Sequence, residues 1–196
     1  MDGRHARRDR NRELVLGAAR GLFQAENLVP SIDLIAERCG LSIRSLYRYF
    51  ADAESLIAAA IEQSMTEGFE RARIPHFGTG SFDERLNAFV DVRVKLYESS
   101  AAGYRATMHH APNIAQLHDA LQRTRRFLRD QTRTQFAPEL ETLVGVERRV
   151  ALITCDCISQ FDSLEHLRRF HRCSVADTKI VVRQTITAAL RGAAAP

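Results

Sequence analysis

Apolar residues recur every three or four positions along most of the chain, and this spacing predicts a series of amphipathic helices. The first helix is expected over residues 12–24. Pro30 then interrupts the pattern, because proline does not fit a helix interior, and Ser31 is placed to cap a second helix over residues 32–38. No segment alternates apolar and polar residues as a half-buried strand does, so an all-α fold is expected.

A short glycine turn separates the second predicted helix from a third. Gly40 suits the left-handed backbone conformation that ends a helix, and Ser42 is placed to cap a new helix that runs toward Phe50. Two short helices joined by a tight turn are typical of a helix-turn-helix, in which the second helix enters the major groove of DNA. Residues 1–51 are therefore expected to form an N-terminal three-helix, helix-turn-helix DNA-binding domain.

The remaining residues, 52–196, are expected to form a larger helical domain. Its predicted helices cover residues 52–73, 82–99, 104–110, 114–136, 145–170 and 175–191. The last two have continuous apolar faces, which suit a helix bundle. Periodicity does not say whether those faces pack inside the chain or against a second copy.

The segment LSIRSLYRYF, residues 41–50, has an apolar and a polar face when it is drawn as a helix. Ile43, Leu46 and Phe50 fall within a narrow arc and are expected to face the core. The opposite side and its borders present guanidinium, phenol and hydroxyl groups, which can bind phosphate oxygens or base edges. These groups belong to Arg44, Ser45, Tyr47, Arg48 and Tyr49. An ordinary solvated face is the alternative, because charged helix faces are common.

The charge distribution favours contact with nucleic acid. The first 50 residues contain nine arginines and six acidic residues, whereas the other 146 residues contain 19 basic and 18 acidic residues. The basic excess therefore lies mainly at the N-terminal end, as is typical of a phosphate-binding region. The preference for arginine over lysine, 26 against two, has genome composition as an alternative explanation.

Other kinds of chemistry are weakly indicated. A glycine-rich phosphate loop, a nucleophile elbow and a metalloprotease motif are missing, so an enzyme is not expected. On a helix, Cys155 and Cys157 would point roughly 200° apart, and no second pair has zinc-site spacing, so neither a metal site nor a cofactor is expected. No apolar run approaches the roughly 20 residues of a membrane span, and the N-terminus lacks a secretory apolar core, which favours a cytoplasmic location.

The segment PSIDLIAERCGLSIRSLYRYFADAESLIAAAI, residues 30–61, resembles the DNA-binding region of the TetR family of bacterial transcriptional regulators. The family pattern has a Ser or Thr cap, Ile-Ala, a glycine turn, a hydrophobic-Ser pair, Tyr-x-x-Phe and a later leucine. The matching residues are Ser31, Ile35, Ala36, Gly40, Leu41, Ser42, Ser45, Leu46, Tyr47, Tyr49, Phe50 and Leu56. The resemblance covers about residues 12–61, and beyond them only the number and length of the helices agree.

The resemblance implies roles for individual residues of the DNA-binding region. Phosphate contacts are implied for Ser31, Ser42, Tyr47 and Tyr49, and contacts with base edges for Arg44, Ser45 and Arg48. Ala53 departs from the pattern, because the family usually has a lysine there close to the DNA backbone. A further expectation is that Arg4, Arg7, Arg8 and Arg10 reach an adjacent minor groove or phosphates, the alternative being a disordered, solubilising tail.

For the larger domain, the resemblance implies a homodimer in which the last two helices pair with those of a second copy, and a ligand pocket enclosed by the fourth to seventh predicted helices. The implied dimer interface consists of Val150, Ile153, Cys157, Phe161, Leu164, Val175, Val182, Ile186 and Ala189. The candidate ligand contacts are Phe69, Phe89, Tyr97, Tyr104, Met108, His109 and Phe127, which favour a largely apolar small-molecule effector. For both sets the alternative is ordinary packing in the chain's own core.

The sequence therefore predicts a ligand-responsive transcriptional regulator that binds a palindromic operator in double-stranded DNA as a homodimer. The resemblance to the family favours a repressor that is released from DNA by its effector. One alternative is a dimeric helical adaptor of the same fold that acts through a protein partner, for which Ala53 is the support. Another is a redox-sensing regulator that uses the thiols of Cys155, Cys157 or Cys173.

Overall fold

The computed structural model describes residues 3–26 and 29–192. Every regular element in these ranges is a helix, which confirms the all-α prediction. The chain divides into two compact units. The first comprises the described residues up to Glu67 together with Ala102–Leu121, and the second comprises Gly68–Ala101 and the described residues from Gln122 onward. The predicted domain boundary between residues 51 and 52 stays a prediction about function.

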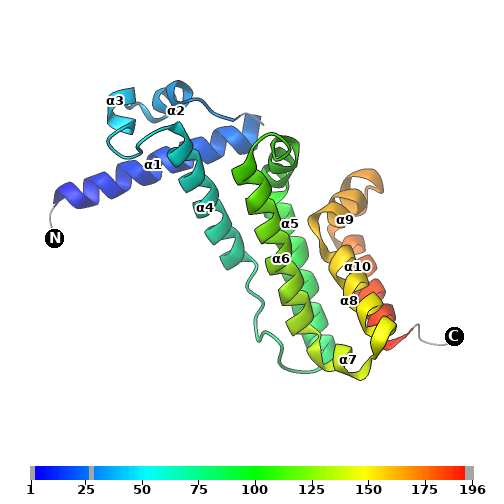
Figure 1. Cartoon of the computed structure of the whole chain (residues 1–196). Coiled ribbons are helices and arrows are strands. Elements are labelled where there is room, and N and C mark those ends of the chain that lie inside the picture. Colours follow the sequence, from blue (N-terminus) through cyan, green and yellow to red (C-terminus); the bar gives the residue numbers. More distant parts are fainter. Residues whose placement is uncertain (1–2, 27–28, 193–196) are drawn as a thin grey trace. The chain divides into compact units, whose positions relative to one another are not determined.

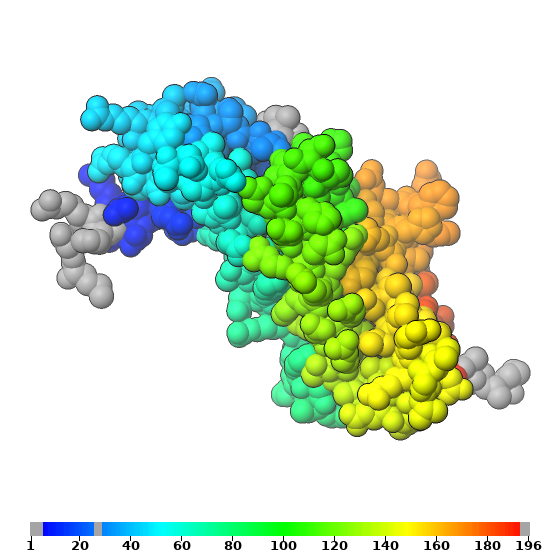
Figure 2. All heavy atoms as spheres, viewed as in Figure 1, coloured from blue at the N-terminus to red at the C-terminus, as the bar shows by residue number. Residues whose placement is uncertain are grey.

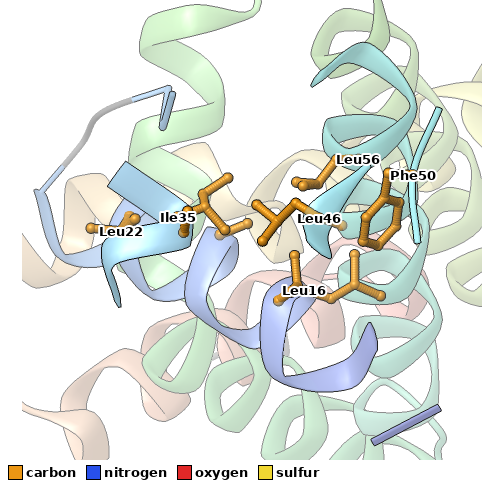
Figure 3. Packing of buried hydrophobic residues seen from close by; sticks show 10 residues of the cluster. Leu16, Leu22, Ile35, Leu46, Phe50 and Leu56 are labelled. Carbon is orange, nitrogen blue, oxygen red and sulfur yellow. The ribbon is translucent and has the colours of Figure 1, made fainter. Parts of the chain in front are cut away.

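The first unit begins with four helices around one apolar core. These are α1 (Gly3–Glu26), α2 (Ile32–Cys39), α3 (Ile43–Leu46) and the first part of α4 (Ala53–Arg71). Figure 1 shows α2 and α3 on the same side of α1, and the apolar side chains of these helices meet between them. Figure 3 shows Leu16, Leu22, Ile35, Leu46, Phe50 and Leu56 pointing toward one another in this core. The three helices predicted for residues 12–50 are therefore present, but α1 starts earlier than expected and α3 is shorter, because its regular part ends at Leu46.

Local sequence signals determine where α2 and α3 begin and end. The Ser31 hydroxyl accepts a hydrogen bond from the backbone N–H of Leu34 at 3.3 Å, and the Ser42 hydroxyl accepts one from that of Ser45 at 3.2 Å. Between them Gly40 has a φ of +64°, which a side chain would disfavour. The predicted caps and left-handed turn are therefore present, and they fix the residues at which α2 ends and α3 begins.

The long hairpin formed by α5 (Phe82–His110) and α6 (Ala115–Gln135) extends through both units. The prediction of two separate helices over 82–99 and 104–110 is wrong, because α5 continues without a break. Gly103 lowers helix propensity but allows a close approach: a Cβ atom there would lie 3.3 Å from the Gln24 side chain of α1. Packing within the first unit thus keeps the chain helical around Gly103, where the sequence alone indicates a low helix propensity.

The second unit ends with α7 (Ala137–Thr142), α8 (Gly145–Ser159), α9 (Phe161–Glu165), a π-helical turn η1 (His166–Phe170) and α10 (Val175–Arg191). The predicted single helix over 145–170 is wrong. Gln160 has an extended backbone, so α8 ends at Ser159 and α9 begins at Phe161. Figure 1 shows α8 and α10 running antiparallel and side by side.

The core of the second unit is built mainly from α5 and the helices that follow it. The rings of Phe89 and Phe136 pack edge to face with centroids 5.1 Å apart, and the hydroxyl of buried Tyr97 donates to Glu165 at 2.6 Å. An ion pair between Arg85 and Glu139 joins α5 to α7. Among the described helices, none is long and apolar enough to cross a membrane.

Candidate nucleic-acid interface

The polar side of α3 and the turn after it is open to solvent. Arg44, Tyr47 and Arg48 are exposed, Tyr47 by 53%, while Leu46 beside them is completely buried. The light-blue and cyan atoms around α3 lie uncovered on the face shown in Figure 2, and several side chains project from it. The segment therefore has one face fixed in the core and another that presents guanidinium and phenol groups outward.

Ile43 differs from the prediction that it faces the core, because its side chain is 41% exposed. The regular part of α3 is only Ile43–Leu46, and residues 47–49 continue as turns. A projection that assumes a full helix through Phe50 therefore does not apply to this segment. Leu46 lies at the centre of the buried face, and Ile43, the first residue of α3, lies at its margin.

The hydroxyl groups of Ser42 and Ser45 form a pair at the start of α3. Their oxygens are 2.9 Å apart, and Ser42 also accepts the backbone N–H of Ser45. One hydrogen suffices for the contact between the two hydroxyl groups, so the other can be donated to an anion such as a phosphate. Ser31, at the start of α2, is exposed and could donate in the same way while it caps its helix.

Two residues of α1 support the turn after α3. The side-chain amide of Asn11 donates to the Tyr49 hydroxyl at 2.9 Å, and the guanidinium of Arg12 lies 5.2 Å from the centre of the Phe50 ring. Tyr49 keeps its own hydroxyl hydrogen for an external acceptor. Asn11 and Arg12 could not be predicted from the sequence, because these contacts join residues 38 positions apart and no local signal marks them.

The basic N-terminal residues belong to a helix. Arg7, Arg8 and Arg10 are exposed on α1, and the side chain of Arg4 lies outside the described part of the chain. Their predicted contact with DNA stays a prediction, and a helical conformation favours phosphates over insertion of an extended arm into a groove. Ala53 is the exposed first residue of α4, so no charge is present at the position where the family usually has lysine.

The candidate ligand residues are divided between the two units. Phe69, Phe89, Tyr97 and Phe127 belong to the second unit, and Tyr104, Met108 and His109 belong to the first. Phe69 and Phe127 contact each other with ring centroids 4.2 Å apart. Met108 and His109 are exposed, and Tyr104 packs beside a small cluster around Leu117. The role of all seven in ligand binding stays a prediction.

The candidate interface residues fall into a buried and an exposed group. Phe161, Leu164, Val182 and Ile186 are buried within the chain itself and therefore cannot reach a second copy in this conformation. The exposed or partly exposed members are Val150, Ile153, Cys157, Val175 and Ala189. Val150 and Ala189 line a surface groove of about 610 Å³ between α8 and α10, together with Val146, Thr154 and Thr185.

The cysteines provide little support for redox chemistry. Burial raises the pKa of the Cys155 thiol to about 12, so it stays protonated and unreactive at neutral pH. Cys157 is exposed on the other side of α8, and the four cysteines are free. The described residues include no group of three or more side chains that could hold a metal ion.

Comparison with known proteins agrees with this geometry. The profile described as "Bacterial regulatory proteins, tetR family" matches residues 15–60. A TetR-family transcriptional regulator from Streptomyces coelicolor has a similar fold, with a TM-score of 0.71 and 20% identity over 92% of this chain and 80% of its own. No curated protein gives a significant match.

Two further solved structures share the fold. One is assigned to the TetR family and comes from Mesorhizobium loti, with a TM-score of 0.70 and 16% identity over 94% of this chain and 96% of its own. The other is the flavonoid-responsive regulator FrrA, with a TM-score of 0.65 and 20% identity over 93% of this chain and 94% of its own. The matches indicate a DNA-binding regulator rather than an enzyme. Residues 15–60 are thus a TetR-family DNA-binding domain, and the chain has the fold of the family's transcriptional regulators.

Proposed function

We propose that the chain represses transcription by binding a palindromic operator as a homodimer and leaves the operator when a small molecule binds. The exposed polar face of α3 and the following turn is the observation that supports this most strongly. Arg44, Tyr47 and Arg48 project from a segment whose other side is buried, so the backbone that carries them is held in place before DNA binds. A preorganised backbone lowers the conformational entropy that is lost on binding.

Replacing Arg48 or Tyr47 by alanine is expected to weaken operator binding by about tenfold or more, because each removes a base or phosphate contact. DNase protection on the DNA that flanks the coding region, at two salt concentrations, would measure the affinity and its salt dependence. Arg126→Ala is the matched control, since Arg126 is an exposed arginine of α6 and lies outside α1–α4. If the Arg48→Ala and Tyr47→Ala variants both bound the operator with wild-type affinity, the proposal that α3 and the following turn contact DNA would be contradicted.

The groove between α8 and α10 supports the proposed homodimer. Val150 and Ile153 are each 53% exposed, and Val146 is exposed on the preceding turn of α8. Apolar side chains that lie together on a surface are often covered by another protein, and pairs of antiparallel helices commonly complete a four-helix bundle. Burial of Phe161 and its neighbours inside the chain supports a smaller interface than the sequence predicted, built from the exposed residues of α8 and α10.

Replacing Val150 by arginine is expected to convert the dimer to monomers, because a charge would be buried in the interface without a partner. Sedimentation velocity at micromolar concentration would show the change in mass, and operator binding should weaken with it, since one half-site contributes only part of the affinity. Phe77→Arg is the control, because Phe77 is 42% exposed in the loop before α5. A Val150→Arg protein that remains dimeric would place the interface elsewhere.

Residues 52–196 are the proposed effector and dimerisation domain, and the effector is proposed to enter the part of that domain that belongs to the second unit. The contact between Phe69 and Phe127 and the burial of Phe89 support a ligand with a mainly apolar body. FrrA, which has a similar fold, is named as responsive to flavonoids, and these are aromatic molecules.

The alternative function, a helical adaptor that acts through a protein partner, differs in one measurable property. Such a protein would show no specific, salt-sensitive binding to duplex DNA.

A further inference from the structure

The largest fully buried side chain of the described residues is that of an arginine. Arg93 lies on α5 in the second unit, and only 1% of it is exposed. Arginine is almost never fully buried unless an acidic group pairs with it, because removing a charge from water is costly. The surroundings of Arg93 should therefore show what compensates its charge.

The hydrogen-bond partners of Arg93 are neutral. Its Nη1 donates to Gln131 Oε1 and its Nη2 to the backbone oxygen of Leu128, both at 2.8 Å. The guanidinium also lies 4.6 Å from the centre of the Phe89 ring. Its Nε is buried and has no hydrogen-bond partner within the described part of the chain. The group that would normally neutralise this cation is thus not among its direct contacts.

The acid whose charge acts on Arg93, Asp156, does not form an ion pair with it. Burial lowers the pKa of Arg93 to about 9, and the charge of Asp156 opposes this shift only in part. The Asp156 carboxylate instead accepts a hydrogen bond from Gln160 at 2.7 Å, and burial raises its pKa. At neutral pH the guanidinium therefore keeps its charge, two of its five N–H groups donate to neutral acceptors, and its Nε has no acceptor.

A second buried arginine of α5 shows what a structural role looks like in this fold. Arg85 is also buried, with 4% exposed, but its two terminal nitrogens donate to the two oxygens of Glu139 at 2.5 and 3.0 Å. Its Nε also has an acceptor, the backbone oxygen of Gly80. Arg85 is thus a satisfied ion pair that joins helices, whereas Arg93, two turns along the same helix, is not.

We propose that Arg93 binds the carboxylate of the effector, which is therefore an organic acid with an apolar body. A carboxylate can accept from Nε and from a free terminal hydrogen at the same time, which gives the planar two-point geometry that arginine favours. The apolar part would lie against the aromatic ring of Phe89 and its neighbours. A singly charged carboxylate fits better than a phosphate, because a dianion costs more to bury beside one cation. This inference rests on the proposed effector response.

The site as described is closed, so binding requires a movement within the second unit. Arg93 is enclosed by its own helix and by α6, which contributes Leu128 and Gln131, with Asp156 of α8 nearby. An acid that reaches the guanidinium must separate these side chains, and the ion pair that it forms would favour the separated arrangement. Such a differential affinity is what a ligand needs to shift a conformational equilibrium.

The test uses matched acids and amides and does not require DNA. Benzoate, phenylacetate and octanoate are compared with benzamide, phenylacetamide and octanamide by thermal unfolding and calorimetry on the full chain. At least one acid is expected to raise the Tm of the wild type while its amide does not, because only the acid supplies a charge. Arg93→Met should weaken binding of that acid by about tenfold or more, and Arg93→Lys by less.

Two further variants separate a ligand anchor from a structural arginine. Asp156→Asn should tighten binding of the acid, because the competing negative charge is removed. The Tm of ligand-free Arg93→Met should equal or exceed that of the wild type, because an uncompensated buried charge has been removed. A lowered Tm in that variant, equal binding of acids and amides, or no effect of any acid would each overturn the inference. Operator binding is tested separately through Arg48→Ala, so a failure here leaves that result intact.

Discussion

Replacing Leu46 by alanine is expected to lower the free energy of unfolding of the first unit by about 3 kcal/mol, and operator binding should be lost at temperatures where the unit melts. Leu46 is completely buried, and Figure 3 shows it between Ile35, Leu56 and Phe50. Its removal leaves a cavity where α2, α3 and α4 meet. Urea unfolding followed by circular dichroism would give the change, read from the midpoint at constant slope.

Ile43→Ala provides the matched control for Leu46→Ala, since both variants shorten an aliphatic residue of the same short helix. Ile43 is 41% exposed, so its replacement should cost less than about 1 kcal/mol. Equal losses in the two variants would mean that Ile43 also packs in the core, as the sequence predicted. The pair therefore measures the one difference between the predicted and the observed orientation of this segment.

Features that depend on neighbouring residues could be predicted from the sequence. The caps at Ser31 and Ser42, the left-handed turn at Gly40 and the exposure of Arg44 and Arg48 each follow from a few adjacent residues. Their physical basis is the hydrogen bonding of helix ends and the steric freedom of glycine, which act within one turn of the chain. The polar face of α3 and the following turn depends on adjacent residues in the same way, which is why it could be predicted from the sequence.

Features that depend on distant contacts could not be predicted. The support of Tyr49 by Asn11 and the continuity of α5 at Gly103 arise from packing against α1, which no local pattern encodes.

The interruption at Gln160 is local but could not be predicted either. It occurs without proline or glycine and is accompanied by a hydrogen bond from the Ser163 hydroxyl to the Cys157 carbonyl at 2.7 Å. Side-chain competition for backbone groups is too weak a signal to read from sequence alone.

The last helices show a different limit of prediction. Apolar periodicity shows that a helix has an apolar face, but it does not show what packs against that face. Val182 and Ile186 follow the same pattern as Val150 and Ile153, yet the first two are buried inside the chain and the other two are exposed on α8. Arg93 was not identified for a related reason: an arginine within an apolar pattern is usually assigned to the surface. Only the arrangement of the surrounding helices shows that it is buried and that its charge is not paired.

Replacing Glu139 by glutamine is expected to destabilise the second unit by about 3 to 5 kcal/mol, because it leaves the charge of Arg85 buried without a counter-ion. Arg85 and Glu139 are only 4% and 13% exposed, and Arg85 also donates to the backbone oxygen of Gln135 at 2.6 Å. The arginine is thus held in place by α6 and cannot turn to solvent when its partner loses charge. Thermal and urea unfolding would measure the loss.

Asp162→Asn is the control for Glu139→Gln, because Asp162 pairs with Arg125 at 2.9 Å where both side chains are substantially exposed. That variant should change stability by less than about 1 kcal/mol, since solvent screens the pair. The double variant Arg85→Met with Glu139→Leu should recover most of the loss of Glu139→Gln, because no buried charge remains. If the double variant is less stable than the single one, the hydrogen bond of Arg85 to Gln135, rather than its ion pair, holds α5 to the end of α6.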